Sequence, residues 1–176
     1  MALTGPAGSG KSHLANAWAA DAGATAFDVR EAPERAAAAF KSAGGRLVLD
    51  DADKAAADMA LVRLLDLARY EGGAVLLVGA EDPSRWPSAT PDLVSRLRAL
   101  PAARLLEPDD ALLTLVLRRL CRERFIELSD KAAGYLASRM QRTFAFAHAL
   151  ANELDRSVVK AARPVALPQA REALAR

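Results

Sequence analysis

The stretch Gly5-Pro6-Ala7-Gly8-Ser9-Gly10-Lys11-Ser12 decides the fold of this chain. It satisfies G-x-x-x-x-G-K-[ST], a pattern in which glycine-rich backbone amides surround phosphate groups at the start of a helix. In that pattern the lysine contacts the β- and γ-phosphates, and the hydroxyl of the last residue, here Ser12, binds Mg²⁺. An apolar, strand-like segment precedes the stretch at 2–4, and an amphipathic run with Leu14 and Trp18 one turn apart follows it. The sequence therefore predicts a phosphate-binding loop between a strand and a helix.

The composition is that of a globular protein of the cytoplasm. A length of 176 residues, 52% of them hydrophobic, suits one domain with an adequate core, or one domain with a small appendage. The formal net charge of +2 is too small to predict nucleic-acid binding from composition. Cys121 is the only cysteine, which excludes a disulfide framework and fits a reducing cytoplasm. Because no apolar run approaches the length of a membrane span, we expect a cytoplasmic location and no membrane partner.

Apolar runs and helical periodicity then divide the chain into two parts. Strands are expected at 2–4, 24–28, 46–49, 74–79 and 104–107, and helices at 11–22, 31–43, 54–70 and 92–97. Two glycine pairs, Gly44-Gly45 and Gly72-Gly73, are expected to end the helices that precede them. Only helices are expected after Pro108, at 109–124, 129–140, 143–161 and 169–176. The sequence therefore predicts an α/β domain at 1–107 and a small helical domain at 108–176.

The expected faces of these last helices follow from helical spacing. The first is expected to bury Leu112, Leu115, Val116 and Leu120; the second Leu136 and Met140; and the third Ala147, Leu150, Leu154 and Val158.

Paired carboxylates follow the apolar run at 46–49. The carboxyl end of a parallel strand is where α/β folds place their ligands. One carboxylate there can bind Mg²⁺ directly or through water, and its neighbour can orient an attacking water. We assign Asp50 to the metal and Asp51 to the water. The alternative is that Asp51 and Asp53 only begin the next helix as capping groups.

Taken together, these residues resemble the DnaA/Hda family of AAA+ ATPases. The stretches that carry the resemblance are 5–14, 47–51, 91–97 and 154–158, and the likeness spans nearly the whole chain. The resemblance implies a P-loop AAA+ three-layer parallel sheet with a small C-terminal helical lid. It also implies ATP or ADP as the ligand, Mg²⁺ as the cofactor, and regulation of replication initiation through DnaA or another AAA+ subunit. The residues that it implies for nucleotide binding are Gly5, Pro6, Ala7, Gly8, Ser9, Gly10, Lys11, Ser12 and His13, the histidine in a supporting role.

Two arginines gain expected roles from the same resemblance. Arg96 matches the arginine finger, a residue offered to the nucleotide on a neighbouring subunit, where its guanidinium neutralises charge on the transferring phosphoryl group. A lid arginine contacts phosphates in relatives, but Ala145 occupies the aligned position, so Arg142, about one turn earlier, is the candidate. A surface role for Arg142 is the alternative.

The chain also departs from the family pattern. Relatives place a polar residue just after the fourth strand, where this chain has Gly79-Ala80, so Glu81 or Asp82 would have to substitute. We therefore expect stable nucleotide binding with weak intrinsic ATP hydrolysis. The sequence also lacks the family's N-terminal segment over the adenine, the sliding-clamp-binding motif and the DNA-binding domain. Adenine recognition and binding of the sliding clamp are thus open, and no sequence-specific DNA binding is expected.

Two other functions remain as alternatives. One is a small P-loop kinase, which phosphate transfer to a small acceptor would reveal. The other is a helicase-loader-like adaptor that binds ATP and hardly hydrolyses it. A basic run, Arg118, Arg119, Arg122 and Arg124, is expected to be a solvated helix face, with docking of a partner protein or nucleic acid as the alternative.

Overall fold

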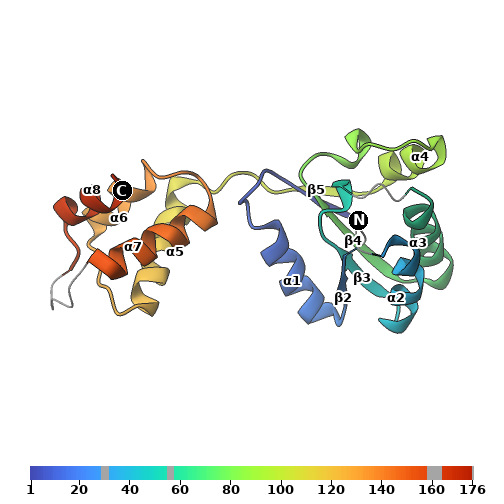
Figure 1. Cartoon of the computed structure of the whole chain (residues 1–176), viewed down its shortest axis with the longest axis horizontal. Coiled ribbons are helices and arrows are strands. Elements are labelled where there is room, and N and C mark those ends of the chain that lie inside the picture. The colour runs from blue at the N-terminus through green and yellow to red at the C-terminus, as the bar shows by residue number, and fades with distance from the viewer. Residues whose placement is uncertain (29–31, 55–57, 158–163, 176) are drawn as a thin grey trace. The chain divides into compact units, whose positions relative to one another are not determined.

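The computed structural model describes residues 1–28, 32–54, 58–157 and 164–175. The chain divides into two compact units, Met1–Leu106, here called the sheet unit, and Glu107–Arg176, the helical unit (Figure 1). The predicted helix ends Glu31, Ala161 and Arg176, and the predicted core residue Val158, lie outside the described residues.

The sheet unit is built on five parallel strands. They are β1 (Ala2–Thr4), β2 (Thr25–Phe27), β3 (Arg46–Leu49), β4 (Ala74–Gly79) and β5 (Ala102–Arg104), in the order β2-β3-β4-β1-β5. The α/β class and the parallel sheet are thereby confirmed. The strand predicted at 104–107 shares only residue 104 with β5: it starts two residues too late and ends three residues too late. β5 is an exposed edge strand without the apolar run of a buried strand, so the apolar pattern did not mark it.

Four helices cover the two faces of this sheet (Figure 1): α1 (Lys11–Ala22), α2 (Ala36–Ser42), α3 (Asp58–Glu71) and α4 (Pro91–Ala99). Alternate strand residues point to opposite faces. Leu47 and Leu77 pack in the core with residues of α2, α3 and α4, whereas Val48 and Val78 pack with residues of α1. The unit therefore has three layers, as predicted.

The first helix uses a different face from the predicted one. Its buried residues are Ala15 and Ala19, whereas Leu14 is 47% exposed and Trp18 is only partly buried. Alanine side chains allow close approach of α1 to the sheet, so the larger residues lie at the margin of the contact. The amphipathic spacing of Leu14 and Trp18 therefore does not mark the face that α1 buries.

Two helices of the sheet unit begin later than predicted. The helix expected from 31 is preceded by a 3-10 turn at Pro33–Arg35, and the helix expected from 54 by a 3-10 turn at Ala52–Lys54. A further 3-10 turn lies at Pro83–Arg85, after β4.

The helical unit contains α5 (Asp110–Glu123), α6 (Asp130–Ala137), α7 (Phe144–Ser157) and α8 (Leu167–Leu174). The Asp109 carboxylate accepts from Leu112 N at 2.8 Å, and the Ser129 hydroxyl accepts from Ala132 N at 3.3 Å, so both begin their helices as N-caps. A single parallel bridge pairs Leu128 with Val165, although no strand was expected after Pro108. None of the helices in the described ranges has the length and apolar character that crossing a bilayer requires.

The core of the helical unit matches the predicted faces in part. Leu120, Leu136, Met140, Ala147, Leu150 and Leu154 are buried as predicted. In α5, however, Leu112 and Leu115 are 43% and 67% exposed, and Leu113 and Leu117 are buried in their place. Helical spacing admits either set, because α5 carries leucines on adjacent faces.

Phe125 provides a stability prediction. It has φ = 58° and is fully exposed, directly after α5, where Phe125 N donates to Arg122 O and Ile126 N to Cys121 O. This helix-ending motif favours glycine at the left-handed position, because a Cβ is strained there. Phe125→Gly is therefore expected to raise the free energy of unfolding by about 0.5–1 kcal/mol in denaturant titrations.

Phe125→Ala is the matched control, because it removes the ring but keeps the strained Cβ. Its unfolding free energy should stay close to that of the wild type. An equal gain from both variants would show that the exposed ring, and not the backbone conformation, is unfavourable.

Candidate functional site

The glycine-rich loop, residues 5–10, connects β1 to α1, and two of its carbonyl groups contact the side chain of Lys11, the first residue of α1. Lys11 Nζ donates to Gly5 O at 2.7 Å and to Pro6 O at 2.8 Å. Gly10 is the N-cap of α1 in a left-handed conformation, so the free amides of the first turn of α1 begin where the loop ends. A lysine ammonium beside a helix N-terminus forms a site of positive potential suited to phosphate groups.

The start of the loop is held tightly between two strands. Gly5 N donates to Ala80 O at 3.3 Å, just beyond β4. A Cβ on Gly5 would lie only 2.6 Å from the carbonyl oxygen of Leu105, so this position has no room for a side chain. Gly5, the first glycine of the motif, is therefore required because the backbone at Leu105 approaches it closely.

The loop also contains an unpartnered polar atom. The Ser9 side chain is buried, with 7% of the residue exposed, and its hydroxyl has no hydrogen-bond partner among the described residues. Buried hydroxyls are usually bonded, so an orphan here fits a loop that gains partners when it binds an anion. Ser12 and His13 are exposed on the first turn of α1.

The predicted carboxylates lie at the same edge of the sheet as the loop. Asp50 follows β3, and only β4 separates β3 from β1 in the strand order. Asp50 Oδ1 accepts from Asp51 N at 2.9 Å. Among the described residues there is no group of three or more His, Cys, Asp or Glu side chains that could hold a metal ion. The metal ligands predicted from the sequence, Ser12 and Asp50, stay predictions.

Asp51, predicted to orient water, is engaged by a neighbouring lysine. It has φ = 52°, and its Oδ1 lies 2.9 Å from Lys54 Nζ. Lys54 N also donates to Asp51 O, which closes the 3-10 turn. This carboxylate is therefore partly neutralised as the structure stands.

Asp53 is a residue of this edge that sequence reasoning considered only as a helix cap. Its Oδ2 accepts from Ala80 N at 2.8 Å, so the side chain reaches from the turn after β3 to the end of β4. Its Oδ1 is buried without a hydrogen-bond partner among the described residues. Only the run of acidic residues after β3 pointed to it in the sequence.

Glu81 and Asp82 were expected to replace the family's polar residue after the fourth strand. Both instead contact residues of their own turn. Asp82 Oδ1 accepts from Ser84 N at 2.9 Å and from Ser84 Oγ at 2.6 Å. These bonds hold the pKa of the Asp82 carboxyl below its ordinary value. Glu81 is exposed and its carboxylate lies 3.9 Å from Arg85. The carboxylate bonded to the end of β4 is that of Asp53.

Arg96 lies on α4 and is held by two carboxylates of its own unit. Its Nε donates to Asp92 Oδ1 at 3.0 Å and its Nη2 to Asp92 Oδ2 at 3.2 Å, while Nη1 donates to Asp66 of α3. Hydrogen bonds to Asp92 and then to Asp66 raise the pKa of the guanidinium, which stays charged. The side chain is 29% exposed. The predicted finger thus lies at the surface, oriented by Asp66 and Asp92.

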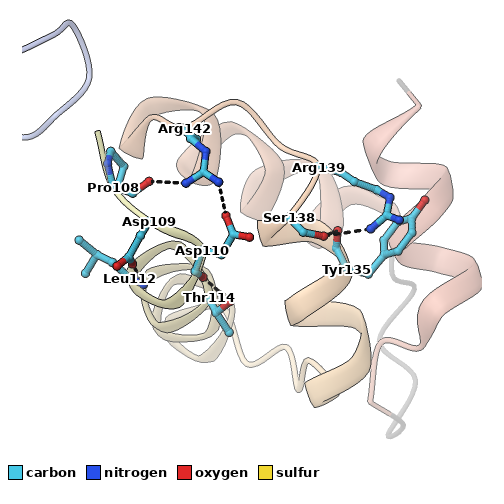
Figure 2. A network of polar contacts seen from close by, with 9 residues as sticks. All are labelled: Pro108, Asp109, Asp110, Leu112, Thr114, Tyr135, Ser138, Arg139 and Arg142. Carbon is cyan, nitrogen blue, oxygen red and sulfur yellow. Dashed lines mark hydrogen bonds and ion pairs between the residues drawn. The ribbon is translucent and has the colours of Figure 1, made fainter. Parts of the chain in front are cut away.

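Arg142 belongs to a separate polar network within the helical unit (Figure 2). Its Nη2 donates to Asp110 Oδ1 at 2.7 Å and its Nη1 to Pro108 O at 3.3 Å. These contacts tie the segment before α7 to the start of α5. Figure 2 also shows Arg139 beside the ring of Tyr135, at 4.3 Å from its centroid.

Two of the four arginines in the basic run, Arg118 and Arg119, pair with acidic neighbours. Arg118 pairs with Asp130, Arg119 Nε donates to Glu123 at 2.9 Å, and Arg124 donates to Asn152. This favours a solvated helix face. Cys121 on the inner side of α5 is buried, and burial raises the pKa of its thiol to about 11, so it is a core residue and not a nucleophile.

Comparison of the sequence with protein-family models and with curated proteins finds no match. Comparison of the structure finds similar solved folds. Domain III of the replication initiation protein DnaA from Thermotoga maritima has a TM-score of 0.76 and 16% identity, over 99% of this chain and 82% of that one. The RuvB Holliday junction branch migration motor of the same organism has a TM-score of 0.73 and 22% identity, over 99% and 60%.

AMPPCP-bound DnaA from Aquifex aeolicus has a TM-score of 0.58 and 18% identity, over 80% of this chain and 50% of that one. This chain thus spans only part of these proteins, and at such identities the likeness concerns the fold. DnaA and RuvB are AAA+ ATPases. With its parallel sheet, its glycine-rich loop after β1 and its helical unit, this chain has the α/β P-loop AAA+ fold.

Proposed function

We propose that this chain is a DnaA/Hda-like AAA+ protein that binds ATP or ADP and regulates chromosomal replication initiation. The observation that carries nucleotide binding is the glycine-rich loop, whose carbonyls at Gly5 and Pro6 accept from Lys11 Nζ and whose buried Ser9 hydroxyl has no hydrogen-bond partner in the described part of the chain. The AAA+ fold and its DnaA-like neighbours support the wider assignment.

In this proposal the residues of the loop edge have separate tasks. The loop amides and Lys11 bind the phosphates, and Lys11 exchanges its bonds to Gly5 O and Pro6 O for phosphate oxygens. Ser12 and Asp50 hold Mg²⁺, which neutralises phosphate charge when bound. Asp51 orients water only when Lys54 releases it. Arg142 acts as a phosphate sensor only if it leaves Asp110.

Arg96 acts on a second protein. Its guanidinium neutralises the charge that develops on ATP bound to DnaA, the proposed partner. Arg96 donates hydrogen bonds to Asp92 and Asp66, which hold the guanidinium on α4, and it acts as a finger only when it exchanges these bonds for phosphoryl oxygens. Nucleotide on this chain organises the contact between the two AAA+ subunits.

The test is hydrolysis of ATP by purified DnaA in the presence of sliding clamp and DNA, with and without this protein. The wild type should stimulate hydrolysis, and Arg96→Ala should lose about a hundredfold or more of the stimulation, since arginine fingers contribute factors of about 10³–10⁵. Binding of ATP by the variant itself should be unchanged.

Arg98→Ala is the matched control, because Arg98 lies on the same helix and is exposed. It should stimulate like the wild type. Stimulation that survives in Arg96→Ala would contradict the assignment of the finger, and absence of stimulation by the wild type would contradict DnaA as the partner.

A second candidate is an ATP-binding adaptor of the helicase-loader type. The bond between Lys54 and Asp51 favours it, because a carboxylate oxygen that accepts from a lysine is less free to accept from a water. Both candidates predict slow turnover by the isolated protein, and only the adaptor predicts no effect on hydrolysis by DnaA.

A further inference from the structure

A chain of three hydrogen bonds connects the turn after β3 to the lysine of the glycine-rich loop. Asp53 Oδ2 accepts from Ala80 N at 2.8 Å, and Ala80 O accepts from Gly5 N at 3.3 Å. Gly5 O in turn accepts from Lys11 Nζ at 2.7 Å. The chain passes through the backbone of two residues, Ala80 and Gly5, so the carboxylate of Asp53 helps to fix the backbone segment to which the start of the loop is bonded.

Close packing keeps Asp53 in this position. A Cβ on Gly79 would lie 3.1 Å from Asp53 Cγ and 2.6 Å from the ring of Trp86, so a glycine leaves the space that these side chains occupy. Trp86 is 6% exposed, and its Nε1 donates to Glu81 O at 2.7 Å. Asp53 and the anchored indole ring of Trp86 thus both pack against Gly79 at the end of β4.

The buried oxygen of Asp53 makes this arrangement costly for stability alone. Oδ1 is enclosed without a hydrogen-bond partner among the described residues. An amide side chain could make the same bond to Ala80 N without burying an unpaired charged oxygen.

We propose that Asp53 is a positioning residue of the nucleotide site, which holds the glycine-rich loop in its binding conformation through Ala80 and Gly5. By accepting from Ala80 N, the side chain of Asp53 fixes the backbone at Ala80, and this keeps Ala80 O in place to accept from Gly5 N. The proposal rests on nucleotide binding by the loop, as proposed above. It does not depend on DnaA as a partner or on Arg96.

Two variants of Asp53 test whether its bond to Ala80 N positions the glycine-rich loop for nucleotide binding or only stabilises the fold. Asp53→Ala removes the acceptor and should weaken binding of Mg-ATP and Mg-ADP by about tenfold, the loss expected for one charged hydrogen bond. Asp53→Asn keeps an acceptor for Ala80 N and should stay within about threefold of the wild type. Affinities would be measured by calorimetry on the full chain, with the folded fraction checked by circular dichroism.

Asp109→Ala is the matched control. Its carboxylate accepts from a backbone amide at 2.8 Å, as that of Asp53 does, but it caps α5 in the helical unit. This variant should lose some stability and keep its nucleotide affinity.

A second measurement needs no nucleotide. Amide hydrogen exchange of Gly5, two links away from the substituted side chain, should be about tenfold faster in Asp53→Ala and near wild type in Asp53→Asn. Unchanged exchange at Gly5 with unchanged affinity would overturn the proposal, as would an Asn variant as impaired as the Ala variant. If exchange at Gly5 responds but the wild type binds no nucleotide, the hydrogen-bonded chain is real and the proposed function fails.

Discussion

Replacing Lys11 by alanine is expected to lower the affinity of the protein for ATP and ADP about a hundredfold, or about 2.8 kcal/mol. Lys11 Nζ lies within hydrogen-bond distance of Gly5 O and Pro6 O, at 2.7 and 2.8 Å. The variant loses the cation that is proposed to contact the phosphates. The bonds to Gly5 O and Pro6 O are exchanged on binding in this proposal, so the expected loss comes from the missing contact between the ammonium and the phosphates, and calorimetric titration with Mg-ATP and Mg-ADP measures it.

Lys41→Ala is the control for this loss. Lys41 lies in the same unit, on α2, and its Nζ is 3.1 Å from Glu71, so it is also an ion-paired lysine. Its removal should leave nucleotide affinity unchanged and cost little stability, because exposed ion pairs contribute little. An affinity of Lys11→Ala equal to that of Lys41→Ala would show that the glycine-rich loop does not bind the phosphates.

The elements that the sequence predicted well are those encoded by neighbouring residues. Strands β3 and β4 have the predicted bounds because each is a continuous apolar run, as a strand buried on both faces must be. Helix α1 also has its predicted bounds, between Gly10 and Gly23. The edge strand β5 had no such signal, because its residues are exposed. The roles of Lys11, Ser12 and Asp50 stay predictions.

The features that the sequence could not predict depend on residues far apart in the chain. Asp53 bonds to Ala80, and Arg96 to Asp66, across 27 and 30 positions. An acidic residue on a helix or turn is ordinarily solvated, and no local pattern distinguishes one that will meet a partner after the sheet assembles. The same is true of Asp110, which engages Arg142. Sequence reasoning could name the arginines but not the carboxylates that hold them.

Gly73→Ala is expected to lower the free energy of unfolding by about 3 kcal/mol, the loss typical of an overpacked site. Gly72-Gly73 was predicted only to end a helix, but the two glycines have different reasons to be glycine. Gly72 has φ = 74° and open space around it. A Cβ on Gly73 would lie 2.2 Å from the ring of Phe40, which is fully buried, and 2.4 Å from Gly45 O.

Neither the buried ring of Phe40 nor the carbonyl of Gly45 can move freely away from a Cβ on Gly73. Gly45 O accepts from Ala74 N at 2.8 Å, next to the first paired residues of β3 and β4, so its displacement would break the start of this ladder. Gly72→Ala is the matched control, since it introduces only a strained backbone conformation and should cost about 1 kcal/mol. Denaturant unfolding compares the two variants. We expect Gly73→Ala to lose about 2 kcal/mol more stability than Gly72→Ala, because the Gly45 carbonyl opposes the new methyl group. Equal losses of stability in the two variants would contradict this and would mean that Phe40 repacks.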